Sequence, residues 1–210
     1  MTITPSITSL FLITLSSIIC YYMPMTYEPK KFNIPELTGI SKQSIDEHIK
    51  LYEGYVKHVN HIRSEMDNVK DDYARSEMTR RLGFEFGGMR NHEYYFEQFE
   101  IGPSSLPDGK LKSLIEAEWG SLEKFIEHFK KVASTRGVGW TMLYIDRQNG
   151  GLITAWVDEQ HFGQLADLDI VLGLDMWEHS YMLDYPPSEK LKYVDAFFQN
   201  LNWETVAKRV

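Results

Sequence analysis

The stretch Asp175-Met176-Trp177-Glu178-His179-Ser180-Tyr181 closes an apolar, β-favouring run that begins at Ile170. A strand that ends in aspartate, with a histidine four residues later, brings a carboxylate oxygen and an imidazole nitrogen together at the end of that strand. Both atoms are ligands of first-row transition metals. A pair at this spacing is weak evidence by itself, because such short motifs match many sequences by chance.

The segments around this stretch predict a small mixed domain. Two helical segments precede three β-favouring runs: residues 110–118 and 121–133, then 140–145, 152–157 and 170–175. Asn149-Gly150-Gly151 is typical of a hairpin turn between the first two runs. Because helices also close the chain, we expect residues 110–210 to form a C-terminal α/β domain with a three-stranded antiparallel sheet.

The residues before this domain favour helices. Ser41 and Ser44 are both candidate N-caps of a long helix, and Ser44 has Glu47 three residues later, as in a capping box. The apolar positions of this helix lie near one stripe: Ile45, Ile49, Val56 and Val59. A long first helix with one buried face is therefore expected.

A second helix, carrying His92, is expected after a charged segment. Residues 67–81 favour a solvated helix or a connection, and the glycines that follow loosen the approach to the second helix: Gly83, Gly87 and Gly88. Residues 102–109, rich in proline, serine and glycine, form the clearest linker in the chain. The sequence therefore predicts an α+β fold, in which an α-helical hairpin domain, residues 25–102, precedes the α/β domain.

Composition excludes several classes of partner and site. The chain has 210 residues, 43% of them hydrophobic, which is enough for one substantial core. Its formal charge of −8 is carried without any block of lysine and arginine, so nucleic acid is not an expected partner. Cys20 is the only cysteine, which excludes an intramolecular disulfide and a cysteine-based zinc site. A metal ion would need histidine and carboxylate ligands.

Residues 1–24 form an apolar N-terminal extension that contains no charged side chain. Leu10 to Met23 has the length of a signal-peptide core and is too short to span a bilayer comfortably. The segment lacks the basic residues and the small-x-small cleavage site of a signal, and a start at Met25 explains it equally well. We therefore expect a cytoplasmic protein with no membrane partner, exported only if residues 1–24 are a genuine signal.

The stretch 175–181 resembles the signature of the iron/manganese superoxide dismutases that supplies their third and fourth metal ligands. Other motifs of that family follow in the same order and cover residues 27–210: Ser41 with His48, Tyr55-Val56 and Asn60; Asn91-His92 with Tyr94, Tyr95 and Phe96; Trp119 to Phe125; Gly137 to Trp140; and Asn202-Trp203-Glu204. Six motifs in order make chance a poor explanation of the resemblance.

The resemblance implies that His48, His92, Asp175 and His179 bind one iron or manganese ion per subunit, with an open coordination position for solvent. It also implies an antioxidant oxidoreductase that disproportionates superoxide to dioxygen and hydrogen peroxide. The choice between iron and manganese stays open, because both metals use the same ligand set. The other histidines in charged helical stretches are expected to be solvated: His58, His61 and His128.

The chain departs from the family pattern beside the first ligand. The family separates this histidine from its gateway tyrosine by eight residues, which is about 80° on a regular helix. Here Tyr55 follows His48 by seven residues, or about 20°, so no π-bulge is needed. Tyr55 is our proton-relay candidate, with a packed aromatic as the alternative. The family's next histidine falls on Tyr52 or Leu51, and the tyrosine that partners it is replaced by Met182.

The residue that orients the solvent ligand also differs from the iron-type arrangement. That arrangement has glutamine four residues before the second histidine, where this chain has Gly88. The resemblance places the substitute in Glu159-Gln160-His161-Phe162, after the strand ending at Val157. We favour His161 and keep Gln160 as its rival. His161→Ala is then expected to lose more activity than Gln160→Ala.

In the family, the glutamate before the last ligand hydrogen-bonds that histidine in the other subunit. Glu178 is expected to do so here, beside Trp177 and Trp140 near the site, in a homodimer with a tetramer left open. Two other classes compete with the dismutase. A two-histidine, one-carboxylate oxygenase needs more open coordination positions than four protein ligands leave. An inactive scaffold that keeps the fold and the metal is the alternative favoured by the changes at Tyr52 or Leu51 and at Met182.

Overall fold

The structure, a computed structural model, describes residues 25–210. The expectations about residues 1–24 and Cys20 therefore lie outside the described residues. Among residues 25–210, we find no helix with the length and apolar character needed to cross a membrane.

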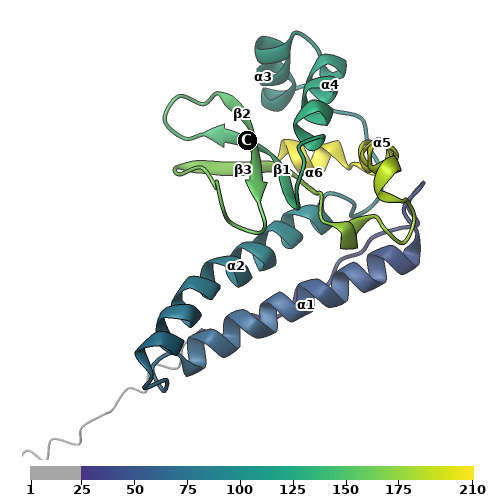
Figure 1. Cartoon of the computed structure of the whole chain (residues 1–210). Coiled ribbons are helices and arrows are strands. Elements are labelled where there is room, and N and C mark those ends of the chain that lie inside the picture. Colours follow the sequence, from purple (N-terminus) through teal and green to yellow (C-terminus); the bar gives the residue numbers. More distant parts are fainter. Residues whose placement is uncertain (1–24) are drawn as a thin grey trace, which may run out of the picture.

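Two long antiparallel helices, α1 (Lys42–Glu65) and α2 (Asp72–Glu97), form the predicted hairpin (Figure 1). Ser41 is the N-cap of α1, because its side chain accepts a hydrogen bond from the backbone N–H of Ser44. Ser44 as the cap is wrong, since it lies buried inside the helix. Glu47 pairs with Lys50 instead of closing a capping box. Helix α1 is α-helical throughout, without a π-turn, as expected.

Helix α2 begins earlier than the sequence pattern indicated. The side chain of Asp71 caps it by accepting from the N–H of Ala74, so most of the charged segment 67–81 belongs to this helix. The helix then continues without a break through Gly83, Gly87 and Gly88. These glycines therefore do not mark its start.

The C-terminal part contains the predicted three-stranded antiparallel sheet. Its elements are α3 (Lys110–Trp119), α4 (Leu122–Ala133), β1 (Gly139–Asp146), β2 (Leu152–Asp158), β3 (Leu168–Asp175), the 3₁₀ turns η1 (Glu178–Ser180) and η2 (Pro187–Glu189), α5 (Lys190–Asn200) and α6 (Trp203–Ala207). The strand order is β2-β1-β3. Strand β1 is almost entirely buried because it lies between the other two, whereas β2 is half-exposed at an edge.

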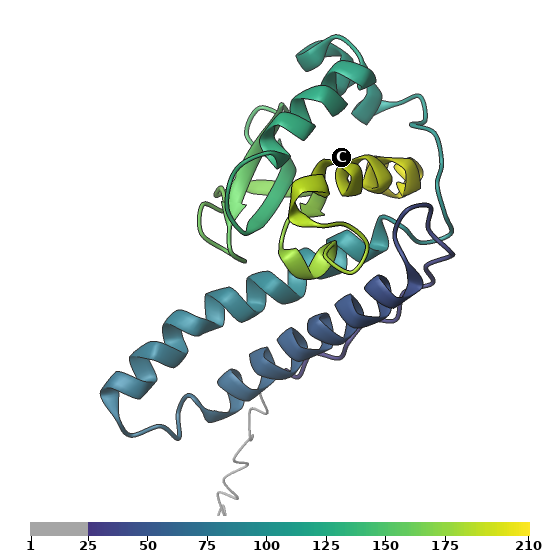
Figure 2. The ribbon, with the colours of Figure 1, turned by 45° about the vertical axis from the view of Figure 1, so that its right-hand side comes forward.

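The C-terminal part rests on one end of the hairpin, and the turn between α1 and α2 projects away from it (Figure 2). Helix α2 packs against β3, and α1 contacts η1. Buried aromatic side chains join the layers: the hydroxyl groups of Tyr95 on α2 and Tyr193 on α5 lie 3.0 Å apart. As a result, the carboxyl end of β3 points at both long helices.

Candidate metal centre

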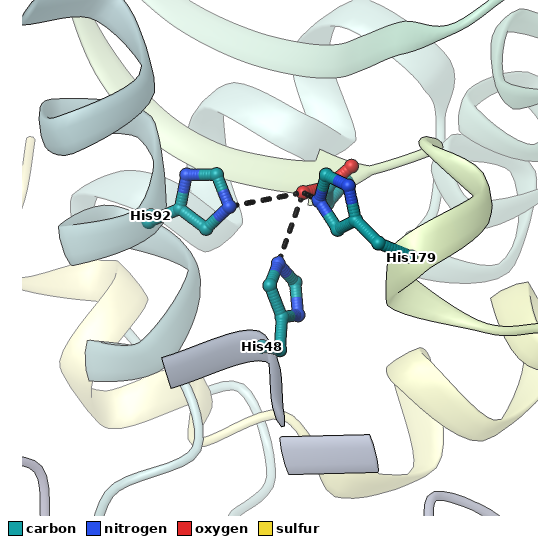
Figure 3. A group of neighbouring side chains, drawn as sticks. His48, His92 and His179 are labelled. Atoms are coloured by element: carbon teal, nitrogen blue, oxygen red, sulfur yellow. Dashed lines mark hydrogen bonds and ion pairs between the residues drawn. The ribbon is translucent and has the colours of Figure 1, made fainter. Parts of the chain in front are cut away.

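Four side chains from four elements converge where β3 meets the hairpin: His48 on α1, His92 on α2, Asp175 at the end of β3 and His179 in η1. We call them the tetrad. The Nε2 atoms of His48 and His179 lie 3.1 Å from Asp175 Oδ2, and that of His92 lies 3.5 Å from it. One ligand atom from each residue lies within 4.8 Å of all the others. Figure 3 shows the three imidazoles turned toward this point.

A tight turn after β3 brings His179 back beside Asp175. The backbone N–H of Trp177 donates to Asp175 Oδ1 at 2.8 Å, and Ser180 Oγ donates to the backbone carbonyl of Asp175 at 3.0 Å. The indole of Trp177 donates to the carbonyl of Glu159 at 3.1 Å. One carboxylate oxygen is thus occupied by the backbone, and the other faces the imidazoles.

The hydrogen bonds of His92 identify the tetrad as a site for a cation. Its Nδ1 lies 2.6 Å from the carbonyl oxygen of Gly88, which can only accept, so Nδ1 carries the proton. In the neutral ring, Nε2 then presents a lone pair toward Asp175. This Nε2 is buried and has no hydrogen-bond partner. A buried unpaired acceptor beside a carboxylate is costly in free energy, and a bound metal ion removes the cost, so the residues fit the group.

The ionisation of the tetrad also suits a metal ion. Burial lowers the pKa of His48 despite its hydrogen bond to Asp175. Burial and the proximity of His48 lower the pKa of His92 to about 3. For Asp175, burial opposes ionisation, but the charge and hydrogen bonds of His179 and His48 hold its pKa below the ordinary value. At neutral pH the site therefore offers the carboxylate of Asp175 and the neutral imidazoles of His48 and His92, the forms that bind metals.

A hydrogen-bonded chain runs beside the tetrad from Tyr55 to Trp140. The side-chain amide of Gln160 donates to the Tyr55 hydroxyl at 3.0 Å and accepts from the Trp140 indole at 2.9 Å. Gln160 is fully buried. The Tyr55 and Trp140 rings each lie about 5 Å from the ring of His92, at 5.0 and 5.1 Å. Trp140 also pairs with Asp175 across β1 and β3.

Of the two rivals, Gln160 and not the favoured His161 has the side chain that joins this chain of hydrogen bonds. The ring of His161 packs against Phe162, with ring centres 4.0 Å apart, and edge-on to Phe84. Its buried Nδ1 has no hydrogen-bond partner. Successive side chains of a tight turn point in different directions, so Gln160 faces inward and His161 lies against α2.

Two glycines of α2 make room for these residues. A Cβ at Gly87 would lie 2.3 Å from the carbonyl oxygen of Gln160, and a Cβ at Gly88 would lie 2.5 Å from the Tyr55 ring. Neither approach is possible with a larger residue at these positions. Asn91 adds a hydrogen bond from its side-chain amide to the same Gln160 carbonyl at 3.0 Å. The loop and Tyr55 are thereby held against the helix that carries His92.

Comparison with known proteins agrees with this geometry. Residues 107–209 match the family model of the C-terminal domain of the iron/manganese superoxide dismutases. An iron superoxide dismutase of Cupriavidus metallidurans is 33% identical over 89% of this chain and 93% of its own length. The chain belongs to the iron/manganese superoxide dismutases. An iron superoxide dismutase of Saccharolobus solfataricus is 30% identical over 97% of its length, and a manganese superoxide dismutase of Corynebacterium diphtheriae is 35% identical over 66% of its length.

The residues at which this chain departs from the family pattern lie outside the tetrad. Tyr52 is buried one turn after His48, and its hydroxyl accepts from the N–H of Lys30 and donates to Glu93. Leu51 and Met182 are 44% and 52% exposed. The family's histidine is absent at Leu51 or Tyr52, and its tyrosine partner is absent at Met182. The Tyr52 hydroxyl is paired and the other two side chains are exposed, so losing this pair leaves no polar group buried without a partner at these positions.

The remaining histidines lie away from the tetrad. His58 and His61 are exposed, as expected, whereas His128 is half-buried and bonds Thr154 at 2.6 Å. Among the residues that position the tetrad and the loop around Gln160, the sequence did not reveal the roles of Asn91 and Gly87. Asn91 was visible only as part of the Asn-His motif, and Gly87 only as one glycine of several.

Proposed function

We propose that the chain disproportionates superoxide, to dioxygen and hydrogen peroxide, at one iron or manganese ion bound by His48, His92, Asp175 and His179. This proposal rests on the Nε2 atom of His92, which is buried without a hydrogen-bond partner and faces the same point as the other members of the tetrad. Membership of the superoxide dismutase family supports the reaction and the metal. The intact tetrad does not favour an inactive scaffold.

A bound iron or manganese ion supplies one-electron oxidation and reduction. In the overall reaction, two superoxide ions and two protons give one dioxygen and one hydrogen peroxide. The residues around the metal ion must therefore hold and deliver protons. Tyr55 is placed to hold a proton, because burial and the carboxylates of Asp175 and Glu85 raise its pKa well above the ordinary value. Its hydroxyl stays protonated at neutral pH and is oriented by Gln160.

A groove of about 630 Å³ between α1 and α2 gives small molecules access to this hydroxyl. Tyr55, Phe84 and Trp177 line the groove, together with Lys50 and Arg81. Both cations are paired, Lys50 with Glu47 and Arg81 with Glu85, each at 2.7 Å, so the charges of the lining are balanced. Superoxide can thus reach Tyr55 without crossing the apolar core.

We also propose that the helical hairpin, residues 25–102, and the α/β part, residues 110–210, are separate domains, and that the protein acts in the cytoplasm. The coil between α2 and α3 supports the first proposal. The apolar run Leu10 to Met23 lacks the small-x-small cleavage site of a signal peptide, which supports the second.

Replacing His92 with alanine tests the ligand set. The His92→Ala variant should purify with little iron or manganese and lose superoxide dismutation, because one of four ligands is missing. His128→Ala is the matched control, since this histidine lies on α4, outside both the tetrad and the groove that Tyr55 lines. Elemental analysis and a superoxide-decay assay measure both properties. Wild-type metal content in His92→Ala would reject the ligand set.

Gln160, rather than His161, is proposed to orient the solvent at the open coordination position. Gln160→Ala should keep its metal and lose activity by roughly 10–100-fold, the usual effect of removing a residue that orients a metal ligand. His161→Ala should lose less activity, because its ring packs against Phe84 and Phe162 and bonds neither Tyr55 nor Trp140. Stopped-flow superoxide decay, normalised to metal content, ranks the two variants. The opposite ranking would assign the role to His161.

A homodimer organised by Glu178 is the proposed assembly. Glu178 is exposed beside His179, which is itself 21% exposed, so a second copy of the chain can reach this histidine. Glu178→Ala should weaken association in sedimentation-velocity experiments and lower metal retention, whereas Glu204→Ala, at another exposed glutamate, should change neither. An unaltered dimer with full metal content would contradict the role of Glu178.

A further inference from the structure

Arg209, which follows α6, reaches back between the two elements that carry His92 and Asp175. Its guanidinium donates to the carbonyl of Tyr94 on α2 at 3.1 Å and to the carbonyl of Val171 on β3 at 3.0 Å. It also pairs with Glu97 at 3.3 Å. The side chain is only 12% exposed. One rigid, five-donor group therefore ties helix to strand.

The same guanidinium lies 3.4 Å from Oε1 of Gln98, a fully buried residue that forms a second tie. The Gln98 amide donates to the carbonyl of Gly173 at 2.8 Å, and its Oε1 accepts from the N–H of Gly173 at 2.9 Å. Gln98 thus binds both backbone groups of one residue of β3, as a neighbouring strand would. Replacing it would leave buried polar groups unpaired.

These ties are close to the tetrad along both elements. Gln98 follows His92 by six residues, which is about 9 Å along a helix. Asp175 follows Gly173 by two residues, which is about 7 Å along a strand. Arg209 also supplies a positive charge at the end of α2, whose own last turn contains no basic residue. The hydrogen bonds and ion pairs of Gln98 and Arg209 do not reach the tetrad.

We propose that Gln98 and Arg209 are positioning residues that set the separation of His92 from Asp175 and thereby slow the loss of the metal ion. The proposal rests on the ligand set given above. With the ties in place, α2 and β3 cannot separate by local opening, and the ion stays between them. Without them, His92 can move away from Asp175 while the rest of the fold is intact.

The rate of metal loss to excess EDTA tests the proposal, measured by elemental analysis on the metal-loaded full chain well below its unfolding temperature. Arg209→Met should begin with the wild-type metal content and lose it about tenfold faster or more, as for other residues that support metal ligands. Gln98→Met should act in the same direction. The double variant should lose metal less rapidly than two independent effects predict, because the residues share one network.

Arg147→Met is the matched control, because Arg147 pairs with Asp169 at the opposite end of β3 and is exposed. It should keep the wild-type rate of metal loss. If Arg209→Met does not fold, Arg209→Lys is used in its place. It keeps the positive charge but loses the several donors of the planar guanidinium, and it should also lose metal faster than wild type. A lower melting temperature with a wild-type rate of metal loss would make Arg209 purely structural and overturn the proposal. Metal retained by His92→Ala would instead reject the ligand set.

Discussion

The structure depends on the burial of one carboxylate among three imidazoles. Asp175 is fully buried, and two of the three histidines around it are buried with it. Such a group is expensive to remove from water unless opposite charge compensates it. The neutral rings of His48 and His92 supply no such charge, so a metal cation held by the whole tetrad is the compensating group. Because each histidine comes from a different element, holding that cation requires α1, α2 and the turn after β3 to meet at one point. The hairpin, the sheet and the aromatic side chains packed between them hold the four side chains of the tetrad at this point.

The close approach of the loop around Gln160 to α2 is the second constraint. Glycine weakens helices, yet α2 has Gly87 and Gly88 in its interior, where local propensity and tertiary packing conflict. The conflict is resolved at the site, because a Cβ at either position would collide with Gln160 or Tyr55. The unfavourable residues of the helix are therefore the ones that let the hydrogen-bonded chain reach the metal centre.

The helices and strands were predictable from the sequence, because they follow periodic patterns of apolar residues. The directions in which side chains point from loops and from the chain's last residues were not. The strands and the helices after residue 110 follow from runs of apolar residues and from Asn149-Gly150-Gly151. The tetrad could be predicted from motifs whose order matches the family. The choice between Gln160 and His161 depends on a turn in which Glu159 has a positive φ of 51°, and no periodicity encodes where its side chains point. The contact of Arg209 with α2, more than 100 residues away in sequence, is likewise invisible to local patterns.

Anomalous X-ray diffraction from crystals of the purified protein, collected on both sides of the iron and manganese absorption edges, tests the central claim most directly. The account predicts one anomalous peak per chain, between the Nε2 atoms of His48, His92 and His179 and a carboxylate oxygen of Asp175. The edge at which the peak appears would also identify the metal. A chain purified with stoichiometric iron or manganese, but with the peak elsewhere, would contradict the account.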